Sequence, residues 1–321
     1  MSQSLNYMNI IFFGSSNFAV PSLKVLTENG YKISCVVTQP DRKKGRGFHL
    51  EGTAVKTLCD KTGIEIYQPE AINTSASIKF LKSLSPDLFI VVSYGQILSQ
   101  EVLEIPKIFA INVHASKLPK YRGAAPINWA IIKGEKITGV TIIKMTQGLD
   151  AGAIILQEIL DIKDEDTVIT LEDELSKKAA GLLIDALKSI ENKTYNLTPQ
   201  QEDKVSFAPK LKKGDGLINW EKSAQDINNL IRGCLGWPGA FTYYNGKLFK
   251  VYKAKISPQV SEFAGFSFGE ITHISKEGIT VAAGGGNLII EELQLEGKRR
   301  MMVEEFIAGH KICAGEMLGK K

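Results

Sequence analysis

The chain starts its first expected strand with Asn9-Ile10-Ile11-Phe12-Phe13, a short apolar run that stops at Gly14. Apolar residues at consecutive positions are typical of a strand that is buried on both faces, inside a parallel sheet covered by helices. A helix is expected next, because Pro21 suits a helix start and Gly30 stands where a helix-ending glycine is common. This stretch therefore predicts the beginning of a β-α-β unit.

Strand and helix signals keep alternating over roughly the first 190 residues, as in folds built from β-α-β units. Further strands are expected at 33–38, 88–92, 109–114, 140–145 and 153–160. A long helix is expected at 171–190, where apolar residues recur at the helical period. The predicted fold class is α/β, with a mostly parallel, Rossmann-like sheet that has helices on both faces.

The last third of the chain has a different rhythm, in which short β-prone runs alternate with turn residues. Asn245-Gly246 between two such runs is a strong signal for a β-hairpin. This rhythm predicts a C-terminal OB-like β-barrel, a fold that commonly binds nucleic acid or sugar. The expected domains are a catalytic Rossmann-like domain at 1–194, a basic linker at 195–213 and the OB-like domain at 214–321.

Bulk properties exclude several classes of protein. A length of 321 residues suggests about two domains, and 44% apolar with 23% charged residues is ordinary for a globular chain. We find no run of about 20 apolar residues and no signal peptide. The four cysteines are scattered and form no CxxC pair. We therefore expect a cytoplasmic protein with reduced thiols and no membrane partner.

The net charge of +4 is small, but all of it comes from residues 203–321, which hold 17 Lys or Arg and 13 Asp or Glu. Residues 1–202 hold 22 of each kind. A positive excess on one domain can attract a polyanion such as RNA. An ordinary solvated surface explains so small an excess equally well, so the charge alone assigns no partner.

Two polar residues end the apolar strand expected at 109–114. Residues two apart on a strand point to the same face, so Asn112 and His114 should project side by side. Ligand sites of open parallel sheets lie at the carboxyl ends of strands. An amide beside an imidazole suits acyl transfer, because one group can stabilise an oxyanion while the other moves a proton. The alternative is a pair of satisfied polar residues without a chemical role.

Two loops add to this site. The loop at 116–126 mixes prolines with small residues, which suits the presentation of backbone groups to a flat heterocycle. Asp150 stands between Gly148 and Gly152, and glycines allow a tight turn that directs a carboxylate inward. A surface hairpin with a turn-forming Asp is the alternative. The sequence has no HExxH motif and no Cys/His cluster, so we expect no metal.

In combination, these segments resemble the folate-dependent formyltransferase family over nearly the whole chain. The resemblance is carried by Asn112-x-His114, Ser116-Lys117-Leu118-Pro119, Tyr121-Arg122-Gly123-Ala124-Ala125-Pro126, Gly148-Leu149-Asp150-Ala151-Gly152, Gln39-Pro40-Asp41-Arg42, Val92-Ser93-Tyr94-Gly95, Phe207-Ala208-Pro209-Lys210 and Trp237-Pro238-Gly239-Ala240. The sequence departs from the family at Lys117, where the loop commonly carries Leu.

The resemblance implies an enzyme whose catalytic residues are Asn112, His114 and Asp150. The co-substrate and formyl donor would be 10-formyltetrahydrofolate, and the acceptor the α-amine of methionine on initiator methionyl-tRNA. Asp150 would orient the imidazole and favour its charged form, and Asn112 would stabilise the oxyanion. The implied folate-binding residues are Tyr94, Gly95, Ser116, Lys117, Leu118 and Pro119.

Basic residues are concentrated at 42–46, where four of the five residues are Lys or Arg. The resemblance implies that this loop contacts the RNA, with phosphate contacts that make the affinity sensitive to salt. A solvated loop is the alternative. The implied tRNA-binding residues are Arg42, Lys43, Lys44, Arg46 and, in the linker, Lys210.

Two further functions stay open. A folate-dependent formyltransferase that acts on a small nucleotide or sugar amine would use the same Asn, His and Asp. A binding module without catalysis is less favoured, because Gly14-Ser15-Ser16-Asn17-Phe18 lacks the GxGxxG fingerprint of dinucleotide binding. We expect the protein to act as a monomer.

Overall fold

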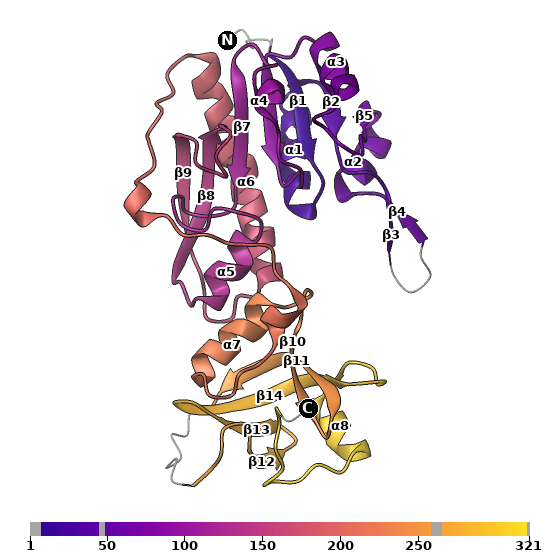
Figure 1. The fold of residues 1–321 in the computed structure, drawn as a ribbon, viewed down its shortest axis with the longest axis vertical. Helices are drawn as coiled ribbons and strands as arrows, with labels where there is room; N and C mark the ends of the chain where they lie inside the picture. Colours follow the sequence, from indigo (N-terminus) through magenta and orange to yellow (C-terminus); the bar gives the residue numbers. More distant parts are fainter. Residues whose placement is uncertain (1–7, 45–48, 258–264, 320–321) are drawn as a thin grey trace. The chain divides into compact units, whose positions relative to one another are not determined.

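The computed structural model describes residues 8–44, 49–257 and 265–319, and the chain divides into two compact units (Figure 1). Unit 1 comprises Met1–Pro126, Ile137–Asp161 and Leu171–Pro209. Unit 2 comprises Ile127–Lys136, Ile162–Thr170 and Lys210–Lys321. Unit 2 therefore includes two short segments that lie, in sequence, between parts of unit 1. Among the described residues, no helix is both long and apolar enough to cross a membrane.

Unit 1 is built on a seven-stranded sheet with the order β5-β2-β1-β6-β7-β8-β9. The strands are β1 (Asn9–Gly14), β2 (Lys32–Val37), β5 (Ile66–Tyr67), β6 (Leu88–Val92), β7 (Phe109–His114), β8 (Ile137–Lys144) and β9 (Ile154–Asp161). The pairings from β5 to β7 are parallel, whereas β8 runs antiparallel to both β7 and β9. The prediction of a mostly parallel sheet is confirmed.

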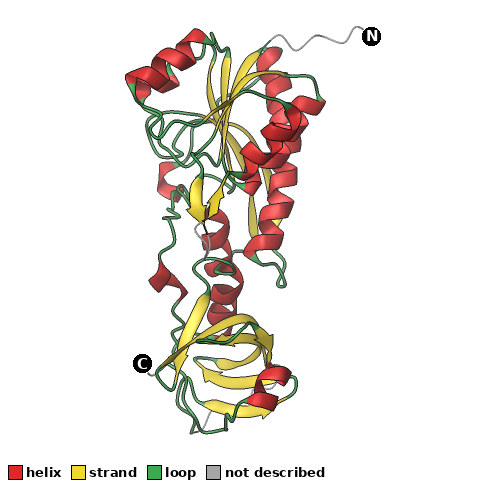
Figure 2. Cartoon of the chain, turned by 90° about the vertical axis from the view of Figure 1, so that its right-hand side faces the viewer, coloured by secondary structure: helices red, strands yellow, loops and turns green. Residues whose placement is uncertain are grey.

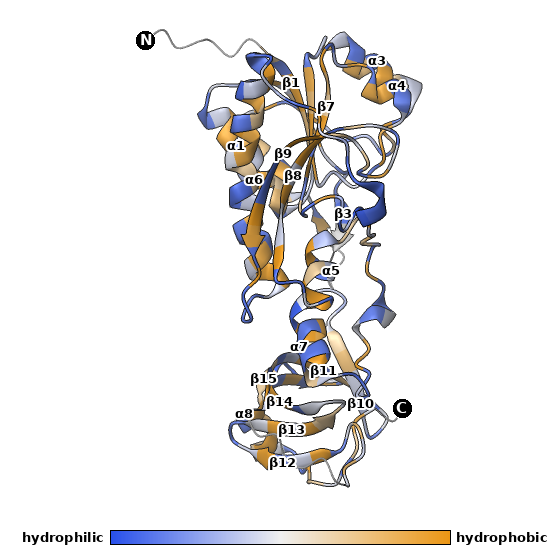
Figure 3. Cartoon of the chain, turned by 90° about the vertical axis from the view of Figure 1, so that its left-hand side faces the viewer, coloured by the Kyte–Doolittle hydropathy of each residue, from blue (hydrophilic) through white to orange (hydrophobic). Residues whose placement is uncertain are grey.

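Helices cover both faces of this sheet (Figure 2). They are α1 (Val20–Glu28), α2 (Ala54–Thr62), α3 (Ser75–Ser83), α4 (Gln100–Leu103) and α6 (Val168–Glu191), with a 3-10 turn at Asn17–Ala19. On β1, Ile11 and Phe13 share a buried cluster with Leu81 of α3. Because alternate residues of a strand face opposite sides, Ile10 and Phe12 point to the other face, where Figure 3 shows α1 and α6.

Some boundaries differ from those expected. The long helix α6 begins at Val168 rather than at residue 171, because Val168 is itself buried and Thr170 donates a hydrogen bond to Asp166 (3.0 Å). The helices α2, α3 and α4 and a small antiparallel hairpin were not anticipated. In this hairpin β3 (Arg42–Lys44) pairs with β4 (His49–Glu51).

Unit 2 contains an antiparallel sheet with the order β10-β11-β14-β13-β12, and β15 pairs with β14. Its elements are α5 (Pro126–Ile132, the proline belonging to unit 1), α7 (Ala224–Gly233), β10 (Ala240–Tyr244), β11 (Lys247–Ile256), β12 (Ile271–Ser275), β13 (Gly278–Ala283), β14 (Gly286–Leu295), β15 (Met301–Met302) and α8 (Val303–Gly309). Asn245 and Gly246, both with positive φ, form the predicted turn between β10 and β11. The switch to antiparallel β-structure in the last third is confirmed.

The two inserted segments of unit 2 are held by hydrogen bonds near the end of α7. Asn128 donates its side-chain amide to the carbonyl of Gly233 (2.8 Å). The Arg232 guanidinium donates to the carbonyl of Asp166 and to the side chain of Asn229. Burial lowers the pKa of Arg232, although nearby acidic groups act in the opposite direction. Unit 2 is thus completed by residues that precede its main segment in the sequence, and Asn128 and Gly233 are 105 positions apart.

Candidate active site

Strand β7 places the first two polar side chains of the site. Its neighbours β6 and β8 bury its apolar residues, and the strand ends at His114, which is only 6% exposed. Asn112 lies two residues earlier and is half-buried. The two side chains project from the same side of the strand, as the period of two predicts. They lie at the carboxyl end of the parallel part of the sheet.

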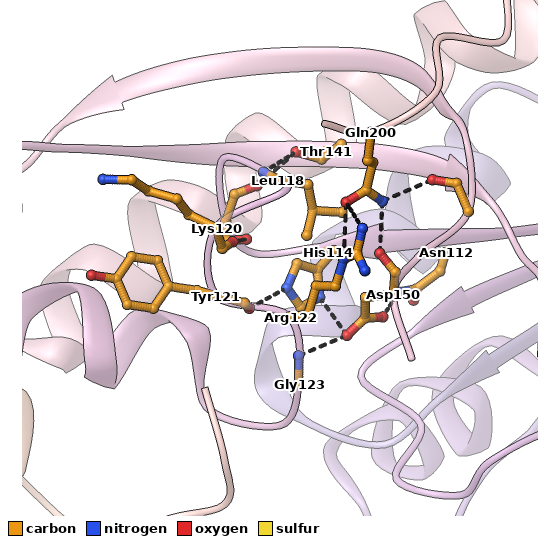
Figure 4. A network of polar contacts seen from close by, with 12 residues as sticks. Asn112, His114, Leu118, Lys120, Tyr121, Arg122, Gly123, Thr141, Asp150 and Gln200 are labelled. Atoms are coloured by element: carbon orange, nitrogen blue, oxygen red, sulfur yellow. Dashed lines mark hydrogen bonds and ion pairs between the residues drawn. The ribbon is translucent and has the colours of Figure 1, made fainter. Parts of the chain in front are cut away.

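Asp150 reaches these two residues from the turn between β8 and β9. Its Oδ1 accepts a hydrogen bond from Asn112 Nδ2 (3.1 Å), and its Oδ2 accepts one from the Gly123 N–H (2.9 Å). The same Oδ2 lies 3.5 Å from His114 Nδ1. Figure 4 shows the carboxylate between Asn112, His114 and Gly123. The structure therefore brings together the three residues that the sequence singled out for chemistry.

The turn that carries Asp150 depends on glycine. A Cβ added at Gly152 would lie 1.7 Å from the carbonyl oxygen of Lys144, a distance at which no side chain fits. Asp150 itself has a φ of +47°, in the left-handed region that ordinary residues rarely adopt. The predicted tight turn is therefore present, and its backbone is unusual at the acidic residue itself.

Both ring nitrogens of His114 face hydrogen-bond acceptors. Nε2 lies 2.9 Å from the carbonyl oxygen of Tyr121, and Nδ1 faces the Asp150 carboxylate. A neutral imidazole has one donor nitrogen, whereas the imidazolium has two. A neutral ring could thus donate to only one of these two acceptors, whereas an imidazolium would present a donor to each of them.

The loop that follows β7 is fixed by internal hydrogen bonds. Thr141 of β8 donates to the carbonyl of Ser116 (2.6 Å) and accepts from the N–H of Leu118 (3.2 Å). Gln157 donates to the carbonyl of Leu118 (3.0 Å), and Ser116 Oγ donates to the carbonyl of Lys120 (2.7 Å). Of the expected folate-binding residues here, Ser116 and Leu118 are buried and Lys117 and Pro119 half-buried. The N–H of Leu118 is thus engaged within the protein.

The loop after β6 holds the other two expected folate-binding residues. Tyr94 is 1% exposed, and its hydroxyl has no hydrogen-bond partner among the residues that the structure describes. Burial raises the pKa of this hydroxyl above its usual range. Gly95 follows with a φ of +94°. Because β6 and β7 are adjacent and parallel, the loops after both strands lie at the same edge of the sheet.

The basic loop begins at a network of side chains. Asp41 accepts hydrogen bonds from Lys56 and from Gln68 (2.8 Å), and these bonds hold its pKa below its usual value. Arg42 is exposed and pairs with Glu70 (3.0 Å). Lys43 and Lys44 lie on β3, and Arg46 lies outside the described residues. Lys210 is exposed and belongs to unit 2.

Several residues of this site were not predicted as members. Gly123 and Tyr121 contribute backbone groups, and only their presence in a dense motif pointed to them. Gln200 and the side chain of Arg122 belong to the same network (Figure 4). Nothing in the sequence indicated Gln200, because it lies 50 residues after Asp150 in a polar stretch. In the part of the chain that is described, no group of three His, Cys, Asp or Glu side chains is placed to hold a metal ion.

Two family models match the chain. The model described as formyl transferase covers residues 8–187, and the model described as formyl transferase, C-terminal domain, covers residues 210–311. The methionyl-tRNA formyltransferase of Acetivibrio thermocellus is 45% identical over 98% of this chain and 100% of its own length. The protein of the same name from Alkaliphilus metalliredigens is 46% identical over 98% of this chain and 99% of its own length.

Solved structures share the fold at lower sequence identity. The sugar 3N-formyl transferase WlaRD, solved in the presence of dTDP and 5-N-formyl-THF, has a TM-score of 0.65 and 22% identity, and the match covers 91% of this chain and 99% of that one. A methionyl-tRNA formyltransferase from Clostridium thermocellum has a TM-score of 0.54 and 19% identity, over 78% of this chain and 94% of that one.

Proposed function

Because the chain belongs to the formyl transferase family, we propose that it transfers the formyl group of 10-formyltetrahydrofolate to the α-amino group of methionine on initiator methionyl-tRNA. The observation that carries the proposal is the cluster of Asn112, His114 and Asp150 at the end of β7. The acceptor is supported by relatives named methionyl-tRNA formyltransferase that match almost the full chain.

In the proposed reaction, the neutral amine of methionine attacks the formyl carbon, and the formyl oxygen becomes an oxyanion. Asn112 uses one amide hydrogen on Asp150, and its second amide hydrogen is suited to donate to that oxyanion. The charge of His114 stabilises the same oxyanion, and Asp150 stabilises the charge of His114. These groups act in a half-buried setting, where electrostatic interactions are stronger than in water.

The intermediate collapses when the bond between the formyl carbon and N10 of the folate breaks. The amine nitrogen has lost one proton and N10 gains one, so protons balance over the reaction. His114 can supply the proton to N10 only after its Nε2–H leaves the carbonyl of Tyr121, which accepts it in the structure. Proton delivery therefore requires a local exchange of hydrogen bonds.

We place the two substrates by the charge and position of the surrounding loops. The folate belongs at the shared edge formed by the loops after β6 and β7, next to Tyr94 and Ser116. The RNA binds the basic loop at 42–46, where Arg42 is exposed, and it binds Lys210. Phosphate contacts of this kind make binding salt-dependent.

The direct test is to incubate the protein with 10-formyltetrahydrofolate and aminoacylated initiator tRNA and to follow the formyl amide on methionine. We expect the product to form on the tRNA-bound methionine. Formylation of a nucleotide amine or sugar amine, with no product on tRNA, would replace this acceptor by a small amine.

A further inference from the structure

The polar stretch around residue 200 contacts the turn that carries Asp150. The side-chain amide of Gln200 donates to the carbonyl of Asp150 (2.7 Å) and to the carbonyl of Gly152 (2.8 Å). Figure 4 draws these contacts, with Gln200 between Arg122 and the turn. One side chain from a distant segment thus bridges two carbonyls of the turn.

These bonds matter because the backbone of Asp150 is in an unfavourable conformation. A residue with a Cβ is less stable in the left-handed region than in an ordinary helical or extended conformation, although Asp tolerates this region better than most residues. Such a conformation persists when the surrounding groups fix it. With a φ of +47°, Asp150 directs its carboxylate at Asn112 and His114. If the turn relaxed, the carboxylate would move away from both.

Arg122 fixes the orientation of the Gln200 amide. Its Nε and Nη2 donate to Gln200 Oε1 at 3.1 and 2.9 Å, and its side chain is only 6% exposed. If the amide were turned over, its NH₂ group would face the guanidinium and its oxygen would face two carbonyls. The donor hydrogens of Gln200 are therefore held on the carbonyls of the turn.

The same segment also positions the other side of the Asp150 carboxylate. The N–H of Arg122 donates to the carbonyl of Ser206 (2.9 Å), and the carbonyl of Arg122 accepts from the N–H of Ala208 (2.8 Å). The next residue, Gly123, donates its N–H to the Asp150 carboxylate. Residues 200–208 thus hold both the carbonyl and the carboxylate of Asp150.

We propose that Gln200 is a positioning residue for formyl transfer, which holds Asp150 in the conformation that pairs with His114, while Arg122 orients the Gln200 amide. This inference rests on the proposed function for its kinetic test. Gln200 acts through Asp150 and touches neither reacting atom. Its role is to keep the carboxylate within reach of the imidazole.

Two substitutions at Gln200 test whether the hydrogen bonds to the carbonyls of Asp150 and Gly152 are required. Gln200→Met removes the amide, whereas Gln200→Glu keeps an oxygen for Arg122 and loses the hydrogens that bond the two carbonyls. Both variants should lower kcat by about 10- to 100-fold, because a displacement of about 1 Å at a reacting group can cost that much. The KM for 10-formyltetrahydrofolate should stay within about twofold, since the lost interaction concerns the transition state.

Two control variants match these substitutions. Gln225→Met removes an exposed side-chain amide that bonds Asn229 in unit 2, and it should leave kcat unchanged. Glu202→Gln changes the outer partner of Arg122 and keeps an oxygen that can accept from the guanidinium. Because the Glu202 side chain is 72% exposed, this variant should have little effect on kcat. If Gln200→Met fails to fold, Gln200→Glu carries the test.

A double-mutant cycle in kcat and the NMR spectrum of His114 distinguish a positioning role of Gln200 from a general loss of protein stability. In an Asp150→Asn background, Gln200→Met should lower kcat by less than about twofold, because both substitutions remove the same interaction, namely the pairing of the carboxylate with His114. The imidazole ¹⁵N signals of His114, assigned with a His114→Gln variant, should shift in Gln200→Glu while those of the other histidines stay in place. Fully additive losses, or unchanged His114 signals, would overturn the proposal.

The two proposals can fail separately. If the wild-type protein formylates no methionyl-tRNA, the proposed acceptor is wrong, and the spectrum of His114 still decides whether Gln200 positions Asp150. If tRNA is formylated and both Gln200 variants keep the wild-type kcat, the positioning role is wrong and the function stands.

Discussion

At Asp150, the backbone and the side chain are constrained by different partners. Gln200 bonds the carbonyl, whereas Asn112, Gly123 and His114 surround the carboxylate. The carboxylate has no close cation other than His114 among the ion pairs of the described residues. The carboxylate of Asp150 is thus shared by the imidazole and two neutral donors, so the loss of either Asp150 or His114 should disturb the site.

Removal of either member of this pair should be severe. Asp150→Ala and His114→Ala should each lower the turnover of formyl transfer by about 10²–10³ or more, as expected when a group that stabilises an oxyanion is lost. Turnover is measured with saturating folate and methionyl-tRNA, and the thermal unfolding of each variant serves as the control. Near-normal formylation by a folded Asp150→Ala protein contradicts the assignment.

The sequence allowed part of this site to be predicted. The two-residue period of a strand drew attention to Asn112 and His114, and flanking glycines drew attention to Asp150, but the resemblance to the formyltransferase family was needed to join the three in one site. Gln200 could not be predicted, because its role depends on where a polar segment without periodicity lies in space. The orientation of the His114 ring was also beyond prediction, since it depends on the backbone carbonyl of Tyr121.

At the scale of elements, Asp87 joins the starts of three neighbouring strands. Its carboxylate accepts from the N–H of Asn9 at the start of β1 (2.8 Å) and from Lys107 (2.8 Å). Its own carbonyl accepts from the N–H of Ile108, which precedes β7. This edge of the sheet is opposite to the one that carries the candidate site.

The ionisation of Asp87 makes a testable contribution to stability. Burial alone would raise its pKa, but hydrogen bonds from Lys107 and Asn9 and the charges of Lys107 and Lys32 together lower it. A carboxyl with a lowered folded pKa stabilises the protein above the unfolded pKa, and this contribution is lost as the pH falls through the folded value. Asp87→Asn should therefore lower the free energy of unfolding by roughly 1–3 kcal/mol at pH 7.

The same variant should approach the wild type in stability as the pH falls from about 4, the ordinary pKa of Asp, through the lower pKa of Asp87 in the folded protein. Urea unfolding at pH 7 and pH 3 measures both differences. Formyl transfer at pH 7 should be unchanged, because Asp87 lies at the far edge of the sheet. A stability difference that is the same at both pH values contradicts this account.

The basic loop at 42–46 should contribute to the binding of tRNA and not to the binding of folate. Arg46→Ala should raise the KM for methionyl-tRNA several-fold. It should also reduce the salt dependence of tRNA binding, because a complex with one phosphate contact fewer releases fewer counterions when it forms. Folate binding, measured by calorimetry, should not change. The matched control is Lys24→Ala, which removes an exposed basic residue of α1. Equal losses of tRNA and folate binding would indicate misfolding instead.

The elements differ in how well the sequence predicted them. The strands β1, β6 and β7 are continuous apolar runs, so their positions could be read directly. The helices α2, α3 and α4 are short, and their few buried residues form no long stripe. Their positions depend on the strands they cover, as for Leu81 of α3, which packs on β1. Local patterns do not contain that information.

At the scale of the whole molecule, the order of residues along the chain differs from their grouping in space. Residues 127–136 and 162–170 stand among the strands of unit 1 in sequence, yet they belong to unit 2. The membership of these two segments in unit 2 could not be predicted, because composition and periodicity do not reveal which unit a short helix joins. The contact between Asn128 and Gly233 is one link that makes the assignment.

That link can be tested by hydrogen exchange. Asn128→Ala leaves the carbonyl of Gly233 without its side-chain donor, which should destabilise unit 2 by about 1 kcal/mol. Amide exchange should become faster in peptides that cover α7 and stay unchanged in peptides that cover β1 and β2. Asn192→Ala, at an exposed position of unit 1, is the control. Equal exchange rates in the Asn128 and Asn192 variants contradict the prediction.

The split composition of unit 2 has a consequence during synthesis on the ribosome. Asn128 and Gly233 are made 105 residues apart, which corresponds to a delay of roughly 5–20 s at ordinary elongation rates. During that interval α5, whose Ile127 and Ile131 are buried in the finished molecule, lacks the main segment of unit 2. The apolar residues of α5 therefore stay unprotected while translation proceeds, and a chaperone has time to bind them.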